Sequence, residues 1–234
     1  KLKAVNAMCF DVSAACSGFI TALDIAASML KAGSYKYALV IGSEKMSEIV
    51  NWKDRSVCVL FGDGAGAVVL KAVDNNTEDD TGVSVGHERG IIDSNIYNDG
   101  TGASVLTGGR RFSDSCSTDI FIHMDGQEVF KFAVKSVPTA IETLLHNNNM
   151  DVNDVDKFIL HQANVRIIES VAKRLKADKD KFPVNLNEYG NTSSASIPIL
   201  LDELNRNGSL KQGEKLVLAG FGAGLSWGSI LLVW

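Results

Sequence analysis

The chain contains one local pattern twice: an apolar strand, a glycine-rich turn and a second apolar strand. The two copies are K-Y-A-L-V-I-G at 36–42 with G-D-G-A-G-A-V-V-L at 62–70, and K-L-V-L-A-G at 215–220 with G-A-G-L-S-W-G-S-I-L-L at 222–232. This repetition predicts an internal duplication, and apolar runs without alternation are typical of strands covered on both faces. Residues 119–234 hold the second copy, whereas only residues 1–73 are available for the first. We therefore expect an α/β protein of two similar halves, the first incomplete in this chain.

Composition excludes several classes of protein. The 234 residues are 45% hydrophobic and 22% charged with a net charge of −5, which argues against a disordered chain, a fibrous repeat and a basic nucleic-acid binder. Apolar runs stay below the ~18–20 residues that a bilayer crossing needs, and the start of the chain lacks the apolar stretch of a secretory signal. We expect no nucleic-acid or membrane partner, and a cytoplasmic location or, for a processed organellar protein, the plastid stroma.

The cysteines and glycines argue against metal and nucleotide cofactors. No C-x-x-C pair occurs among Cys9, Cys16, Cys58 and Cys116, so a disulfide framework or zinc site is not expected. The glycine runs at 62–66 and 220–224 are each followed by an apolar strand, which leaves no helix N-terminus for a pyrophosphate. The acidic stretch at 74–80 resembles a calcium loop in composition only. We expect no metal and no redox cofactor.

The first part of the chain predicts strands around one buried helix. Residues 18–32 carry few charges and end at Gly33, which is typical of a buried helix with a glycine after its C-terminus. Apolar runs predict strands at 7–12, 37–42, 57–61 and 65–73. The polar stretch D-N-N-T-E-D-D at 74–80 is the best candidate for a boundary. We place the first domain at residues 1–80 and the second at residues 81–234.

The second part predicts helices that alternate with short strands. Residues 94–119 are rich in Ser, Gly, Asp, Asn and Thr, and we expect a loop there. Apolar residues at helical spacing predict a helix at 129–146. The other predictions are a strand at 158–160, a helix at 165–175, a polar turn at 185–197 followed by a helix ending near 207–208, and strands at 216–219 and 229–234.

Cys16 lies at a predicted strand-to-helix junction in the string D-V-S-A-A-C-S-G-F. A thiol at a helix N-terminus lies near the positive end of the helix dipole, which favours the thiolate. The alternative is a buried, inert cysteine, which is the commoner state of a cysteine in general. The small residues before Cys16 and the Gly18 after it favour a reactive thiol, because packing alone would accept larger side chains.

Two further polar residues, His161 and Asn191, are candidates for catalytic groups. His161 ends the apolar run F-I-L and begins the polar loop H-Q-A-N. Asn191 follows Gly190 and precedes a predicted helix. Taken singly, the commoner interpretations are a hydrogen-bonded structural histidine and a helix-capping asparagine. The other histidines have weaker settings, and they are His87, His123 and His146.

Taken together, these segments resemble the thiolase-like condensing enzymes, most closely the β-ketoacyl-acyl-carrier-protein synthase III family. The strings that carry the resemblance are D-V-S-A-A-C-S-G-F, V-L-F-G-D-G-A-G-A, L-H-Q-A-N-V-R-I-I, Y-G-N-T-S-S-A-S-I-P and G-F-G-A-G-L-S-W-G-S. They are spread over most of the chain and occur in the family's order. The Cys-His-Asn set resembles the type III branch, since elongating synthases have a second histidine in place of Asn191 and thiolases have a second cysteine.

The resemblance implies a thiolase-like fold of two similar α/β halves in five layers, αβαβα, and a homodimer. Members of the family carry about a hundred further residues that complete the first half. We therefore expect the missing N-terminal segment to be supplied by a separate chain or by sequence not included here.

The resemblance also implies a reaction. It is the decarboxylative Claisen condensation of a short acyl-coenzyme A with malonyl-acyl carrier protein, which gives 3-oxoacyl-acyl carrier protein and CO2 and initiates fatty-acid synthesis. Cys16 would be the nucleophile, and the backbone N–H groups of Cys16 and Ala223 would form the oxyanion hole. His161 and Asn191 would donate hydrogen bonds to the enolate. Coenzyme A enters as the substrate thioester, and no cofactor is implied.

Further positions match the family one by one. The resemblance implies substrate or coenzyme A binding by Arg55, Phe61, Phe130 and Asn164, although Ser56 stands where the family commonly has glycine. It implies a basic docking patch for the acidic carrier protein at Arg166 and Lys131. A solvated helix face is the alternative for Arg166.

Two other functions remain open at this point. One is a related type III condensing enzyme with a different acyl donor or acceptor, of the polyketide or 3-hydroxy-3-methylglutaryl-coenzyme A synthase kind. The other is a non-catalytic acyl-binding subunit. The retained Cys16, His161 and Asn191 argue against the latter, because decayed copies usually lose the nucleophile first.

Overall fold

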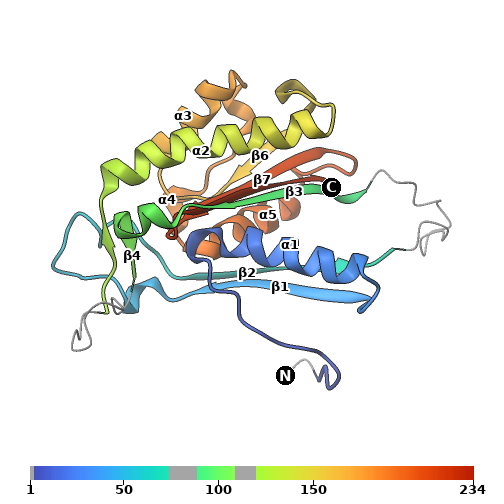
Figure 1. Ribbon diagram of the computed structural model, residues 1–234, viewed down its shortest axis with the longest axis horizontal. Helices are drawn as coiled ribbons and strands as arrows, with labels where there is room; N and C mark the ends of the chain where they lie inside the picture. Colours follow the sequence, from blue (N-terminus) through green and yellow to red (C-terminus); the bar gives the residue numbers. More distant parts are fainter. Residues whose placement is uncertain (1–2, 74–88, 109–119) are drawn as a thin grey trace.

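The computed structural model describes residues 3–73, 89–108 and 120–234 (Figure 1). Its α-helices are α1 (Gly18–Lys31), α2 (Gly126–Asn147), α3 (Val165–Leu175), α4 (Leu186–Tyr189) and α5 (Ser196–Arg206). Its strands are β1 (Tyr37–Glu44), β2 (Gly64–Lys71), β3 (Gly90–Asn98), β4 (Leu106–Thr107), β5 (His123–Met124), β6 (Lys157–Leu160), β7 (Lys215–Gly222) and β8 (Ser226–Val233). Short 3-10 turns include η1 (Ala15–Ser17), η3 (Gly100–Val105) and η6 (Ser193–Ala195).

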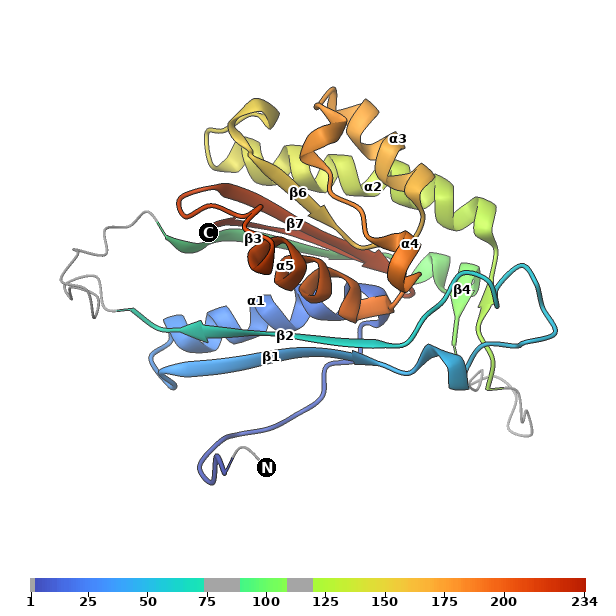
Figure 2. The ribbon, with the colours of Figure 1, turned by 180° about the vertical axis from the view of Figure 1, so that it is seen from behind.

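The elements form four layers in the order helix, sheet, helix, sheet (Figures 1 and 2). Helices α2 and α3 cover one face of a four-stranded sheet, and α1 and α5 cover the other. Strands β1 and β2 form a second sheet on the far side of α1 and α5. The predicted α/β class is confirmed, and the described residues supply four of the five layers that the sequence led us to expect.

The larger sheet has the strand order β3-β8-β7-β6. Strand β7 is antiparallel to β8 and parallel to β6, with Leu160 opposite Ala219. The carboxyl ends of β6 and β7 therefore meet at one edge of the sheet. This edge is where polar groups that follow parallel strands gather in α/β folds.

Each predicted copy of the repeated pattern forms an antiparallel strand pair preceded by a central helix. In the first, α1 precedes β1 and β2, and Gly42 lies opposite Gly66. In the second, α5 precedes β7 and β8, and Gly220 lies opposite Gly228. The two helices pack side by side between the two sheets (Figure 2). The predicted boundary at residue 80 lies outside the described residues, so the division into 1–80 and 81–234 stays a prediction.

Two apolar cores hold these layers together. One fills the space between α2, α3 and the larger sheet, and the other lies between α1, α5 and the opposite face of that sheet. Helix α3 shows why the sequence folds this way, because Ile167, Ile168 and Val171 share its buried face while Arg166 and Lys173 are exposed. Burying an aliphatic side chain of this kind stabilises the fold by about 1.5–3 kcal/mol.

The predicted helices at 18–32, 129–146 and 165–175 are confirmed, and Gly33 has the left-handed conformation (φ +76°) expected after a helix end. The predicted loop at 94–119 is wrong in its first part, since β3 continues to Asn98 and η3 follows. Strand β3 forms because β8 offers it a hydrogen-bonding edge, which its polar composition did not reveal. Residues 109–119 lie outside the described part.

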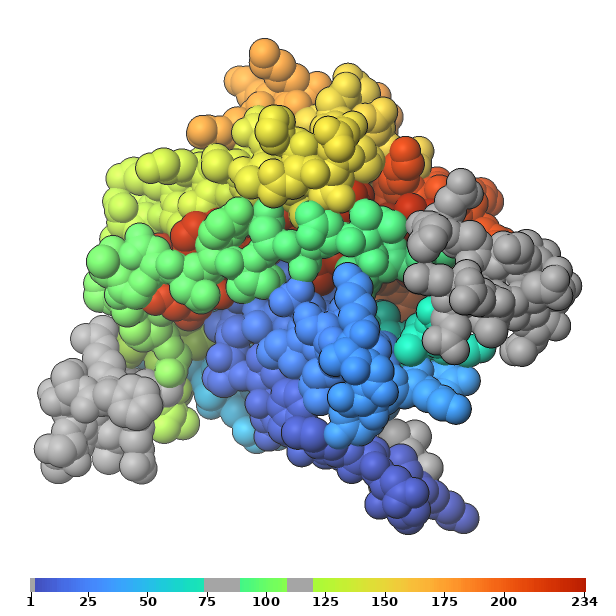
Figure 3. All heavy atoms as spheres, turned by 45° about the vertical axis from the view of Figure 1, so that its right-hand side comes forward, coloured from blue at the N-terminus to red at the C-terminus, as the bar shows by residue number. Residues whose placement is uncertain are grey.

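Two predicted strands are absent from the described residues. Residues 7–12 have irregular backbone and extend away from the body of the molecule, and Phe10 is exposed (Figure 3). Residues 57–60 form turns, and Phe61 makes a single bridge with Asn191. Apolar composition favours a strand only where another strand offers its backbone groups, and these segments have no such neighbour in the described structure.

The described residues cover only one face of residues 37–42, and the expected cover on the other face stays a prediction. Val40 is buried, but Tyr37, Leu39 and Ile41 on the opposite face are 61%, 45% and 55% exposed. Val69 of β2 is exposed on the same sheet. The smaller sheet thus has one face against α1 and α5 and one open apolar face.

Candidate functional site

Cys16 lies in η1, directly before α1, and its backbone packs against strand β7. A Cβ added at Gly222 would lie 2.9 Å from the Cys16 Cβ and 3.0 Å from its backbone nitrogen, so only glycine fits there. Ala15 adopts a left-handed conformation (φ +46°), which turns the chain sharply before the cysteine. The hydroxyl of Ser17 donates to the carbonyl of Ala14 (2.7 Å) and fixes this turn.

Burial controls the protonation of Cys16. The residue is 8% exposed, and this desolvation raises the pKa of its thiol to about 11, an effect that the negative charge of Glu44 increases. A hydrogen bond with the Ser193 side chain acts in the opposite direction. Burial therefore opposes the expected effect of the helix terminus, which favours the thiolate. The resting group is therefore a thiol.

His161 follows β6 and is buried (1% exposed). Its backbone N–H donates to the carbonyl of Ala219 in β7 (2.8 Å). Its Nδ1 lies 2.7 Å from the Ser196 hydroxyl, and its ring packs edge-on against Phe221, with 5.3 Å between centroids. Burial lowers the pKa of the imidazole to about 3, so the ring is neutral at physiological pH.

Asn191 follows α4 and Gly190, whose left-handed φ of +65° turns the chain. Its side-chain Oδ1 accepts a hydrogen bond from the Ser193 N–H (2.9 Å), which leaves the amide Nδ2 as the group that can donate elsewhere. Asn191 is not a helix cap as expected, because the N-cap of η6 is Thr192 and the N-cap of α5 is Ala195. The backbone of Asn191 also bonds to Leu60 and Gly62, which anchors it to the segment before β2.

Ser193 links all three predicted residues. Its side chain bonds to Cys16, its N–H bonds to Asn191, and its carbonyl interacts with His161. Like Ala15, it has a left-handed conformation (φ +51°). Cys16, His161 and Asn191 come from three segments far apart in the sequence, and η6 brings them together.

The sequence analysis missed several residues of this site. Ser193 and Ser196 bond to the predicted residues, Gln162 bonds through its side chain to Leu160 and Asn185, and Glu44 accepts a hydrogen bond from Ser194. The run N-T-S-S-A-S was a usable sign, because most buried polar side chains have hydrogen-bond partners.

The predicted oxyanion-hole residue Ala223 lies in the turn between β7 and β8, directly after Gly222. It is half-buried. Because Gly222 contacts Cys16, the turn that carries Ala223 begins beside Cys16.

The four residues predicted to bind substrate have different settings. Arg55 is exposed in the turn segment before β2, and Phe61 is half-buried beside Met46 and Val57. Phe130 of α2 packs against the core under that helix. Asn164 caps α3, because its Oδ1 accepts from the Arg166 N–H (2.9 Å). The structure therefore shows Asn164 as the cap of α3, and its contact with substrate stays a prediction.

The two residues predicted to dock a carrier protein lie on neighbouring helices. Arg166 is exposed in the first turn of α3, and Lys131 is exposed on α2. Lys131 forms an ion pair with Glu128 (2.6 Å), which offsets its charge locally. Exposed pairs of this kind contribute little to stability.

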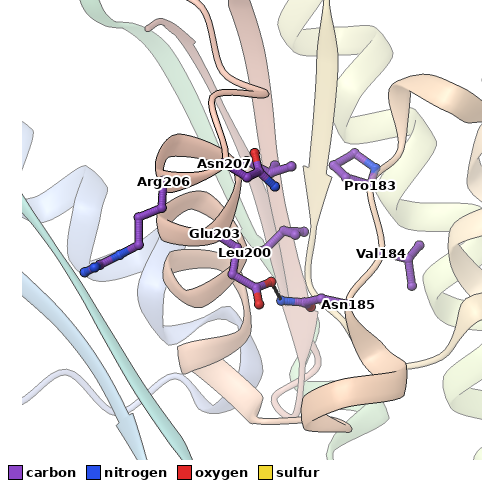
Figure 4. Close-up of a pocket in the computed structure, with 8 residues that line it drawn as sticks. Pro183, Val184, Asn185, Leu200, Glu203, Arg206 and Asn207 are labelled. Carbon is purple, nitrogen blue, oxygen red and sulfur yellow. Dashed lines mark hydrogen bonds between the residues drawn. The ribbon is translucent and has the colours of Figure 1, made fainter.

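The remaining candidates stand apart from this site. Cys9 is exposed and Cys58 half-buried, whereas Cys116 and His87 lie outside the described residues. Within residues 3–73, 89–108 and 120–234, no three or more His, Cys, Asp or Glu side chains are arranged to hold a metal, and no helix is long and apolar enough to cross a membrane. A hollow between α5 and the segment before α4, where Glu203 accepts a hydrogen bond from Asn185, holds none of the predicted residues (Figure 4).

Comparison with known proteins gives the family. The family model described as "3-oxoacyl-[acyl-carrier-protein] synthase III" matches residues 10–100, and the model of the C-terminal part of this family matches residues 145–234. β-Ketoacyl-[acyl-carrier-protein] synthase III of Clostridium acetobutylicum is 46% identical over 240 residues, which is 100% of this chain and 70% of the relative.

Solved structures agree with the sequence match. The crystal structure of 3-oxoacyl-[acyl-carrier-protein] synthase III from Aquifex aeolicus has 44% identity and a TM-score of 0.87, over 99% of this chain and 69% of that one. The enzyme of the same name from Pseudomonas aeruginosa has 36% identity and a TM-score of 0.86, over 97% of this chain and 67% of that one. By sequence and by fold, the chain belongs to the 3-oxoacyl-[acyl-carrier-protein] synthase III family of thiolase-like condensing enzymes, acyltransferases of fatty-acid synthesis.

Proposed function

We propose that this protein condenses a short acyl-coenzyme A with malonyl-acyl carrier protein through an acyl group carried on Cys16. The observation that carries the proposal is the convergence of Cys16, His161 and Asn191 on Ser193. A thiol, a neutral imidazole and a carboxamide buried together suit acyl transfer followed by enolate formation.

In the first half-reaction, Cys16 loses its proton, and the sulfur attacks the thioester carbonyl as the thiolate. The tetrahedral oxyanion accepts hydrogen bonds from the N–H groups of Cys16 and Ala223. The bond to coenzyme A then breaks, and the leaving thiolate takes up one proton in place of the one that Cys16 lost.

In the second half-reaction, the malonyl group loses CO2, and the electron pair of the broken C–C bond forms an enolate. His161 and Asn191 donate hydrogen bonds to the enolate oxygen. The Asn191 carboxamide suits this role, because its oxygen already accepts from Ser193 and its Nδ2 group can donate. The enolate carbon then attacks the acyl-Cys16 carbonyl, the 3-oxoacyl product leaves, and the Cys16 thiolate takes up a proton.

The other positions complete the proposal. Arg55, Phe61, Phe130 and Asn164 contact the coenzyme A thioester or its acyl chain, and exposed Arg166 and Lys131 contact the acidic carrier protein. The enzyme acts as a homodimer in the cytoplasm and uses no cofactor besides its thioester substrates. The family relationship supports these assignments.

The test is to incubate the intact protein with isotopically labelled acetyl-coenzyme A and to locate the label by peptide mass spectrometry. We expect the label on Cys16, and Cys16→Ser should remove it. Cys58→Ser is the matched control, because that half-buried cysteine is not assigned to the site. Label on Cys9 or Cys58 would show that the proposal is wrong.

A further inference from the structure

The turn between β7 and β8 is attached to η1 by both residues at its base. Gly222 and Ser226 lie opposite each other on the two strands and close the turn of residues 223–225. Gly222 packs against Cys16, and the Ser226 hydroxyl oxygen lies 2.9 Å from that of Ser17. The base of the turn therefore contacts two consecutive residues of η1.

The two hydroxyls form a buried chain of hydrogen bonds. Ser17 is 1% exposed and Ser226 is 4% exposed. The Ala14 carbonyl can only accept, so it takes the proton of the Ser17 hydroxyl, 2.7 Å away. The Ser226 hydroxyl then donates its own proton to a lone pair of the Ser17 oxygen. Strand β8 is thereby joined to the backbone turn that precedes Cys16.

The residue before Ser226 is anchored separately. The Leu225 N–H donates to the Asp99 carbonyl, and the Asp99 N–H donates to the Leu225 carbonyl, both at 2.8 Å. The Leu225 side chain is buried and lies close to Gly102. Ala223 and Gly224 are thus the two residues of the turn between these attachments, with Gly222 before them and Leu225 after them.

We propose that Ser17 and Ser226 are positioning residues that fix the backbone N–H of Ala223 relative to that of Cys16. The inference rests on the proposed function, in which these two N–H groups bind the oxyanion of the tetrahedral intermediate. Two donors stabilise an oxyanion fully only when both are held at hydrogen-bonding distance from it before the charge develops. The contact between the hydroxyls supplies a side-chain link for this purpose, and it can be removed without altering the backbone of either segment.

Ser226→Ala tests the proposal, because it removes the link and leaves the bond between Ser17 and Ala14. Loss of an oxyanion donor costs about 10²–10³ in rate, and we expect its displacement to slow Cys16 acylation by acetyl-coenzyme A at least about tenfold, with little change in KM. Alkylation of Cys16 by iodoacetamide should keep the wild-type rate, because displacement at a saturated carbon forms no oxyanion. Ser229→Ala is the matched control, since Ser229 is also buried in β8 and its hydroxyl bonds to Asn95.

Ser17→Ala removes the same contact from the side of η1, and it answers the question if Ser226→Ala does not fold. When the two hydroxyls act as one unit, the double variant should acylate no more slowly than the slower single variant. Wild-type acylation in Ser226→Ala and Ser17→Ala, or equal losses of acylation and alkylation, would overturn this inference alone. A wild-type protein that is alkylated but never acylated at Cys16 would contradict the proposed function, and this inference with it.

Discussion

At the scale of single residues, burial decides the protonation of the two titratable groups at the site. It raises the pKa of the Cys16 thiol to about 11 and lowers that of His161 to about 3, so both rest in their neutral forms. A neutral pair costs less to bury than an ion pair.

The neutral His161 ring makes stability depend on pH. Its pKa is lowered from 6.5 in the unfolded chain to about 3 in the folded protein, so between these values the unfolded chain binds the proton. Above pH 6.5 the ring is neutral in both the folded and the unfolded chain. As the pH falls from 6.5 toward 3, the unfolded chain takes up the proton, and the free energy of unfolding decreases. Lowering the pH from 7 to 5 should cost about 2 kcal/mol through this group.

Urea unfolding of the intact protein at pH 7 and pH 5 measures this loss. His161→Gln should remove that part of the pH dependence, whereas His146→Gln, at an exposed position near the end of α2, should keep it. An equal change in unfolding free energy in wild type and His161→Gln would show that the buried ring is not the source.

At the scale of elements, the site depends on strand β7 approaching η1 closely. Gly220 and Gly222 alternate on the face of β7 that touches residues 16–20, and the side chain of Cys16 lies over Gly222. Glycine weakens a strand, and here its missing side chain leaves room for another backbone. A similar close contact occurs in β2, where the missing side chain of Gly66 leaves room for the backbone of Ile199 in α5.

Gly222→Ala should displace Cys16 and abolish its acylation. The new Cβ would lie 2.9 Å from the Cys16 Cβ, so one of the two elements must shift. Overpacking of this kind costs about 1–3 kcal/mol of stability. The measurements are the thermal midpoint and the rate of Cys16 labelling by acyl-coenzyme A. Gly100→Ala is the control, because a Cβ there has open space, and labelling of Gly222→Ala at the wild-type rate would contradict the close contact.

The helices were easier to predict than the strands. The buried face of α3 is encoded locally, in the spacing of Ile167, Ile168, Val171 and Leu175. Strand β3 is not encoded in this way, since its hydrogen bonds are completed by β8, whose residues lie more than a hundred positions further along the chain. Residues 7–12 are the opposite case. Their composition favours a strand, but they have no neighbouring strand in the described structure, and their backbone is irregular.

At the scale of the molecule, the layers leave two surfaces of different character. The outer face of β1 and β2 is apolar, with Leu39, Ile41 and Val69 exposed. The exposed side of α3 is charged and carries Arg166, Lys173 and Arg174. The net charge of the chain is −5, so a basic patch on α3 can attract an acidic protein only over a short range.

Arg166→Glu should raise KM for malonyl-acyl carrier protein far more than KM for acyl-coenzyme A. The Debye length at 0.15 M salt is about 8 Å, so the reversal acts only on a partner docked close by. Lys173 lies about two helical turns further along α3, roughly 10 Å away, and Lys173→Glu should have a smaller effect.

The quantity to compare is kcat/KM for malonyl-acyl carrier protein across a salt series in the two variants and the wild type. Equal values and equal salt slopes for Arg166→Glu and the wild type would assign Arg166 to a solvated helix face.

The sequence by itself determined the α/β class and the helices, because both follow from the local spacing of apolar residues. It also identified Cys16, His161 and Asn191 as candidates, because each lies in a string of residues that resembles the family. Only the tertiary structure decided how the candidates meet and what states they rest in. Ser193 and Ser196 join them through hydrogen bonds between distant segments, and the resting thiol and imidazole are neutral because the layers exclude water. Burial and long-range hydrogen bonding depend on which segments become neighbours, and local sequence does not contain that information.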